Sequence, residues 1–236
     1  MFEIVVMPLT ELWADPEHSS EDLKETLAEL QSVLTTEAGF EVTWDETVSR
    51  GPNFDADGVN VYCIYGLRAA AAWLEFNDTL DAFEMGDEPW SHEILDKLEE
   101  HGKSERFPQI LHSSDTTFAA FVPVDMPDVF LMEGEDDADL DFSVGSAVGL
   151  RRELDDLRAA LGLEEGLEEH LDDIVFDPAE DPLAEPRYGW LVLSARTNEA
   201  LEKKLPLLII FEVDEDEDDE DDEEDGEEGG EEADSE

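Results

Sequence analysis

The stretch LPLLIIFEV, residues 205–213, decides how this chain folds. It has no charged or polar residue between Leu207 and Phe211. A strand with one face in water alternates apolar and polar residues, whereas a short continuous apolar run is typical of a strand buried on both faces. We therefore expect these residues to form an interior strand of a sheet.

The chain turns acidic directly after this stretch. Of its 68 Asp and Glu residues, 19 lie in residues 212–236, which contain no Lys or Arg. A segment with so much charge and so few apolar residues cannot bury enough surface to fold, so we expect residues 214–236 to be a disordered acidic tail. Residues 1–213 are expected to form one globular domain, because their number suits a single core.

The acid is not confined to the tail. Residues 1–211 keep 49 acidic residues against 13 basic ones, which leaves a formal charge of −36 out of −55 for the whole chain. Such a surface repels nucleic acids and anionic lipids and attracts basic proteins through its long-range field. We therefore expect a basic protein as the partner, and neither a nucleic acid nor a membrane. The oligomeric state stays open.

Hydrophobic periodicity and turn residues predict an α+β fold: a single domain with a mixed sheet that helices cover on one side. Ser19 or Ser20, Ser91 and Ser146 are expected to cap helices. The period after residue 187 is ambiguous between strand and helix, and helix is preferred. The expected strands are 2–8, 40–44, 59–65, 117–124, 128–132 and 205–213, and the expected helices are 19–34, 66–76, 91–101, 146–162 and 187–204.

No motif in the sequence predicts a catalytic residue, a cofactor or a metal site. NFDADG, residues 53–58, matches the first half of a calcium loop, but Ile64 stands where the bidentate Glu is needed, so an ordinary Asp-Gly turn before a strand is expected. LHSSDTTF, residues 111–118, holds His, Ser and Asp close together, but catalytic triads are assembled from distant segments. We expect a polar turn there and a protein that is not an enzyme.

The single cysteine, Cys63, lies in the apolar stretch VYCIY and is expected to be a small buried residue. One cysteine cannot form an internal disulfide, and the first residues do not resemble a secretory leader. The longest apolar run is also far shorter than the roughly 20 residues that cross a bilayer. These features predict a cytoplasmic protein, of bacterial or archaeal type.

Two kinds of residue are candidates for partner binding. Trp90 stands among charged residues in DEPWSHE and is the best candidate for an exposed aromatic anchor. The others are carboxylates of the internal acidic stretch EGEDDADLD and of the tail. They are Asp136, Asp137, Asp139, Asp214, Glu215 and Asp216.

Three hypotheses account for the acid. The first is an interaction protein that binds or neutralises a basic partner, either as an immunity protein or as a mimic of the phosphate track that nucleic-acid enzymes recognise. In size and charge, though in no motif, the chain is similar to the immunity proteins of bacterial toxin systems. The alternatives are a cytosolic protein adapted to high salt, with no particular partner, and an enzyme whose site the sequence does not reveal.

Overall fold

The computed structural model describes residues 1–14, 19–46, 57–112, 118–132 and 142–211, which form an α+β fold around one six-stranded sheet. The strand order is β2-β1-β6-β3-β5-β4. All neighbours are antiparallel except β3 and β5, so the sheet is mixed, as predicted. The strands are β1 (Phe2–Val6), β2 (Asp57–Val59), β3 (Phe118–Val122), β4 (Phe130–Met132), β5 (Phe142–Ser146) and β6 (Leu207–Phe211).

The apolar run that follows Pro206 forms β6, which lies in the interior of the sheet between β1 and β3. Successive side chains of a strand point to opposite faces. Leu207 and Ile209 accordingly belong to one apolar cluster, and Leu208 and Ile210 pack in another on the opposite face. The expected burial of this strand on both faces is confirmed.

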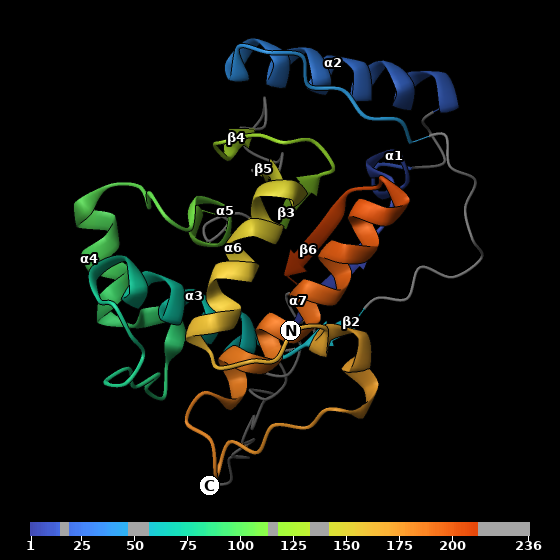
Figure 1. Ribbon diagram of the computed structural model, residues 1–236. Helices are drawn as coiled ribbons and strands as arrows, with labels where there is room; N and C mark the ends of the chain where they lie inside the picture. The colour runs from blue at the N-terminus through green and yellow to red at the C-terminus, as the bar shows by residue number, and fades with distance from the viewer. Residues whose placement is uncertain (15–18, 47–56, 113–117, 133–141, 212–236) are drawn as a thin grey trace, which may run out of the picture.

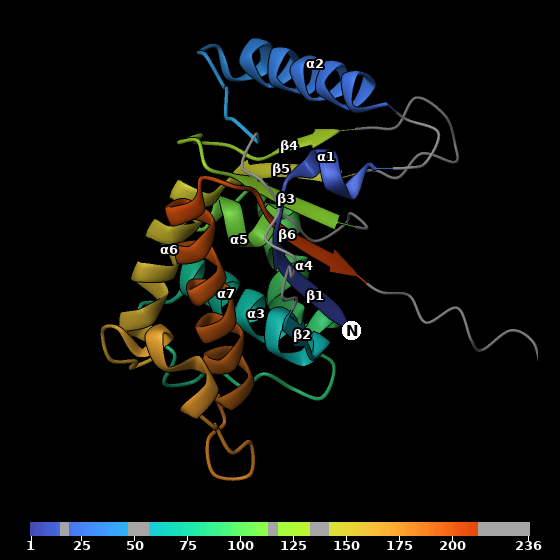
Figure 2. The ribbon, with the colours of Figure 1, turned by 90° about the vertical axis from the view of Figure 1, so that its right-hand side faces the viewer.

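Helices cover both faces of the sheet, unequally (Figures 1 and 2). The larger layer contains α3, α6 and α7, and α2 lies across the other face. The expectation of helices on one side only was wrong, because Leu30 and Leu34 of α2 pack with Val5 and Leu208 on the second face. The helices are α1 (Leu9–Leu12), α2 (Ser20–Ala38), α3 (Val61–Phe76), α4 (Glu93–His101), α5 (Pro108–His112), α6 (Ala147–Ala160) and α7 (Ala184–Lys203), with 3-10 turns η1 (Pro89–Ser91) and η2 (Leu167–Asp173).

Small residues let α3 and α7 pack closely. The four alanines at 69–72 are fully buried. At Gly189, an added Cβ atom would lie 2.3 Å from the carbonyl oxygen of Cys63, far inside contact distance. The two helices therefore meet backbone to backbone at this point.

Two predicted strands are not strands. In the stretch 59–65, β2 ends at Val59 and α3 begins at Val61, because the side chain of Asn60 caps the helix and accepts a hydrogen bond from the Tyr62 N–H at 3.0 Å. Tertiary packing thus overrides the strand propensity of the aromatic and β-branched residues. Residues 40–44 form neither helix nor strand, and the Val42 N–H donates to Thr35 Oγ1 at 2.9 Å instead of to a neighbouring strand.

The other boundaries follow the predictions more closely. Ser19 and Ser146 cap α2 and α6 as expected, and the ambiguous segment after residue 187 is helical. The cap of α4 is His92, whose Nδ1 accepts from the Ile94 N–H, and not Ser91. The strand β5 was not predicted. No helix in the described part of the chain is long and apolar enough to cross a membrane.

Candidate partner-binding surface

Basic residues gather on one part of the molecule. Seven of the 13 lie in α6, in α7 or at Lys204 directly after it. Most of them are paired with acids, so they neutralise the surface around these two helices. The ion pairs are Arg151 with Asp155 at 2.7 Å and Glu168 at 3.2 Å, Arg196 with Glu199 at 2.6 Å, Lys203 with Glu199 at 2.5 Å, Arg152 with Asp125, and Arg187 with Asp181.

Two segments far apart in the sequence carry acid without any base. Neither residues 69–96 nor residues 159–186 contain Lys or Arg. We call residues 77–88 of the first segment and 163–183 of the second, which includes η2, the two loops. Among the residues whose exposure the structure describes, each loop exposes five carboxylates. We call these ten carboxylates the acidic end: Asp78, Asp81, Glu84, Asp87, Glu88, Glu164, Glu165, Glu169, Asp177 and Glu180.

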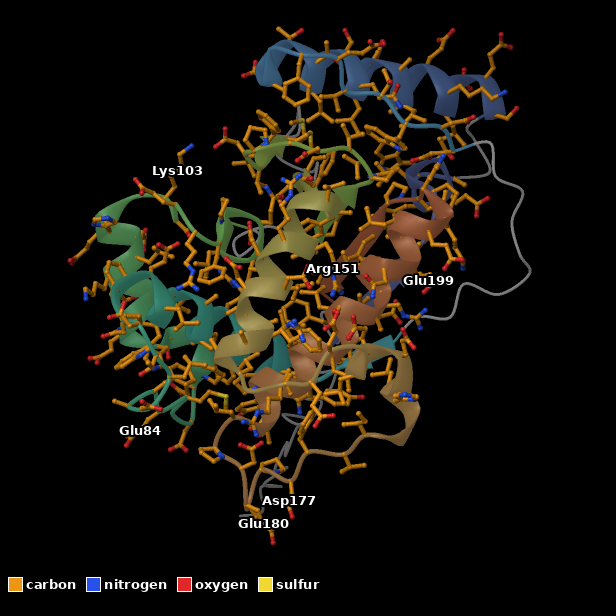
Figure 3. All side chains as sticks on the ribbon, in the orientation of Figure 1. Glu84, Lys103, Arg151, Asp177, Glu180 and Glu199 are labelled. Atoms are coloured by element: carbon orange, nitrogen blue, oxygen red, sulfur yellow. The ribbon has the colours of Figure 1, made fainter. Side chains whose placement is uncertain are left out.

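The fold brings the two loops to the same end of the molecule, away from α2 (Figures 1 and 2). In Figure 3, Glu84 of the first loop and Asp177 and Glu180 of the second all lie at this end. The meeting point is Gly66 of α3, where an added Cβ would lie 2.7 Å from Met85 Sδ and 3.3 Å from Pro186 Cδ. Met85 belongs to the first loop, and Pro186 follows the second.

The 77–88 loop is tied to the core. Leu80 and Phe83 are buried in the larger apolar cluster. The Trp73 indole N–H donates to the Thr79 carbonyl at 2.9 Å, and the Phe83 ring stacks on His92 at 5.7 Å. Its carboxylates therefore stand on an anchored backbone.

The 163–183 segment is held in a similar way. Asp177 Oδ1 accepts from the Ala179 N–H at 2.9 Å, and Asp181 Oδ1 accepts from the Leu183 N–H at 2.9 Å. The Arg187 guanidinium pairs with Asp181 and donates to the Leu161 carbonyl at 2.9 Å. Asp177 and Glu180 are thus displayed by short polar turns of defined geometry.

Trp90 lies beside the first loop, in η1, and 41% of its surface is exposed. Its ring packs edge-on against Tyr62 at 5.3 Å and Tyr65 at 6.3 Å. Trp90 is thus exposed and held in place, and its role in binding stays a prediction. The other predicted contact residues lie outside the described part of the chain: Asp136, Asp137, Asp139, Asp214, Glu215 and Asp216.

The sequence shows the excess of acidic residues, but the convergence of ten of them at the acidic end was not predicted. The signal that could have found it is the absence of Lys and Arg from 69–96 and 159–186, two long stretches in a chain with 13 basic residues. That signal does not show that the two stretches meet, because the contact at Gly66 joins parts of the chain about 100 residues apart.

Buried ionisable groups hold the fold together. The Glu153 carboxyl group, 6% exposed, accepts from the backbone N–H groups of Gln109 at 2.8 Å and Ile110 at 2.9 Å, and so ties α5 to α6. Burial raises the pKa of Glu153 to about 8, against the lowering effect of these two donors. Glu75 of α3 similarly accepts from Ser104 and from the backbone N–H of Arg106 at 2.9 Å.

The residues considered for chemistry are described only in part. Burial, and to a lesser extent the charge of Glu185, raises the pKa of the Cys63 thiol to about 12, so the thiol is protonated at neutral pH. Asp57 and Gly58 belong to β2, whereas residues 53–56 of the half calcium loop and residues 113–117 lie outside the described ranges. Among the residues that are described, no three His, Cys, Asp or Glu side chains are grouped as a metal ion requires.

Residues 1–211 match the model of a protein family described as "Putative DNA-mimic protein". The chain belongs to this family. The match runs from residue 1 to the end of β6. No curated protein and no solved structure matches it.

Membership of this family corrects the predicted partner. From the charge alone, basic proteins in general were expected as partners and nucleic acid was not, because an acidic surface repels phosphate. The expectation of a basic partner with no relation to nucleic acid was wrong, since a DNA mimic is recognised by proteins that bind DNA. The same charge that excludes DNA itself makes the surface resemble DNA to such a protein. An acidic interaction protein, the coarser prediction, agrees with the family.

Proposed function

We propose that this protein binds a DNA-binding protein in place of DNA and thereby blocks it, without catalysing a reaction. The match of residues 1–211 to a DNA-mimic family carries the proposal. We take the acidic end as the proposed binding surface. Its ten exposed carboxylates come from two segments that contain no Lys or Arg.

The proposed mechanism is substitution of carboxylates for phosphates. Arg and Lys side chains that contact DNA phosphates form the same charge-assisted hydrogen bonds with carboxylates. Two loops that converge at Gly66 present acid from two directions, as the two strands of a duplex present phosphates on either side of a groove. Anchored loops reduce the conformational entropy that binding would otherwise cost.

The net charge also raises the rate at which the partner associates. A field from −36 charges on residues 1–211 steers a basic surface toward the protein, and such steering raises association rates by 10–10³-fold at low salt. The finer form of the proposal is an inhibitor that acts in the cytoplasm on a nuclease or another DNA-binding protein, in the manner of an immunity protein.

A competition experiment tests the proposal. Proteins that the immobilised full chain retains from its host lysate at low salt are identified and purified, and each is titrated onto a fluorescent DNA duplex with and without the chain. We expect at least one of them to lose its DNA in proportion to the chain added. Retained proteins that bind duplex and chain simultaneously would refute the mimicry.

A matched pair of variants locates the surface. In D78N/D81N/E84Q/D87N/E88Q, five carboxylates of the 77–88 loop become amides, and in E21Q/E25Q/E29Q/E37Q/E41Q the same change is made at five exposed positions in and next to α2. Both variants change the net charge equally. The loop variant should compete much more weakly than the α2 variant, and equal weakening would mean that only total charge matters.

A further inference from the structure

A pocket of about 650 Å³ opens beside Trp90, and this volume falls within the range of sites that hold drug-sized ligands. Its wall includes Tyr65 and Trp90 together with Asp96 and Glu99 of α4. The pocket therefore combines aromatic surface with carboxylates, and its size leaves room for a long side chain.

Trp90 is the aromatic wall of this pocket. Its edge-on contacts with Tyr62 and Tyr65 fix the ring, while 41% of its surface stays open. A fixed, exposed indole attracts a cation placed over its face, and Trp is the best of the aromatic side chains in this respect. The pocket is thus prepared for a positively charged group.

The charges around the pocket leave two carboxylates unopposed. Lys103 is paired with Asp128 at 2.6 Å. Arg68 also lines the pocket, but it is 7% exposed, its Cζ lies 5.3 Å from the Tyr65 ring centroid and it donates to the Leu111 carbonyl at 3.3 Å, so its guanidinium is already engaged by the protein. Asp96 and Glu99 are exposed, and within the described ranges no ion pair involves either of them.

Asp96 and Glu99 also have the right spacing. They stand three residues apart on α4, so they lie on the same face of the helix one turn from each other. Lys97, between them in sequence, lies 4.0 Å from the Phe76 ring centroid and is directed away from this face. Two neighbouring carboxylates beside an indole suit a planar cation with several N–H donors.

We infer that this pocket accepts an arginine side chain from the DNA-contacting surface of the partner, with the guanidinium on Trp90 and its N–H groups toward Asp96 and Glu99. The inference rests on the proposed function and names the contact that fixes the partner in place. Arginine suits the pocket better than lysine, because a guanidinium stacks on aromatic faces and pairs with carboxylates through two parallel bonds.

The test uses a probe and no partner. The full chain is titrated with the peptide acetyl-Gly-Arg-Gly-amide while the five Trp indole N–H signals are followed by NMR, with W90F identifying the signal of Trp90. We expect a saturable shift of the Trp90 signal that exceeds the shifts of the other four. The same peptide with citrulline, which has the shape of arginine without its charge, should give no saturable shift.

A pair of charge-matched variants separates the pocket from the general field. D96N/E99Q should weaken peptide binding about tenfold, as loss of two partly exposed ion pairs implies. E21Q/E25Q on α2 removes the same charge elsewhere and should change it less than about twofold. Equal weakening by the two variants, or equal shifts with the citrulline peptide, would overturn the inference.

The two proposals fail separately. If the chain displaces DNA from its partner but the peptide does not shift Trp90, the pocket assignment is wrong and mimicry stands. If the peptide binds at Trp90 but no retained protein loses its DNA to the chain, the pocket recognises arginine and the DNA-mimic function is wrong.

Discussion

Replacement of Gly189 by Ala tests the close approach of α3 and α7, on which the position of the acidic end depends. The new Cβ would lie 2.3 Å from the carbonyl oxygen and 2.8 Å from the carbonyl carbon of Cys63, and both are backbone atoms that cannot swing aside. Ordinary contact begins near 3.4 Å, so the helices must separate by about 1 Å. Overpacking of this kind costs about 1–3 kcal/mol, which the better helix propensity of Ala offsets by up to about 1 kcal/mol.

The expected net loss is roughly 1–2 kcal/mol, or about 2–8 °C in Tm for a domain of this size, measured by circular dichroism. Gly66→Ala is the matched control in the same helix pair. There the closest atom is Met85 Sδ at 2.7 Å, the far part of a flexible side chain, so the Tm should stay within about 2 °C of the wild type. A G189A protein that melts at or above the wild-type temperature would refute the account of this helix contact.

Three further predictions concern charge. Glu153 has a pKa of about 8 in the fold against an ordinary value of 4.5, so its contribution to stability is complete below about pH 4.5 and is lost as the pH rises through about 8. The Tm of the wild type minus that of Glu153→Gln should therefore fall over this range, and a difference that stays constant from about pH 4.5 to about 8 would contradict the pKa assignment. Deletion of residues 214–236 removes 18 carboxylates and no described element, so the circular dichroism spectrum should be unchanged and association with the partner, followed by stopped flow, should be slower but not abolished. Complete loss of binding would instead locate the site in that segment. The Tm of the full chain should rise between dilute and molar salt, because salt screens repulsion among the 68 acids; this is also what salt adaptation requires, and an equal Tm in both would argue against it.

The fold class could be read from the sequence because the strongest signals were local. Residues 207–211 are apolar without interruption, and α2 and α6 each have a serine cap and a regular leucine stripe, so these elements stand where the sequence predicts them. Residues 59–65 misled the prediction, because Tyr62, Ile64 and Tyr65 favour strands while the Asn60 cap and burial against α7 select a helix. No local pattern in residues 59–65 indicates a helix strongly enough to outweigh their strand propensity.

The types of residue in the candidate site could be predicted from the sequence, but the position of the site in the fold could not. Charge counting alone shows that residues 1–211 are acidic, and the aromatic among acids at Trp90 indicates an exposed anchor, which the structure places beside a pocket. The acidic end depends on contacts of Met85 and Pro186 with Gly66, and long-range contacts of this kind have no signature in a single sequence. The partner class needed the family match as well.

The interior position of β6 has a consequence for biosynthesis. β6 follows every other described element in the chain, yet it supplies the hydrogen-bonding neighbour of both β1 and β3. While the ribosome is still making α7, the two halves of the sheet have nothing to join them, and the apolar faces of β1, β3 and α3 stay open to water. The sheet can therefore be completed only after β6 has been synthesised. Until then, repulsion between the strong negative charges of the incompletely folded chains opposes their aggregation.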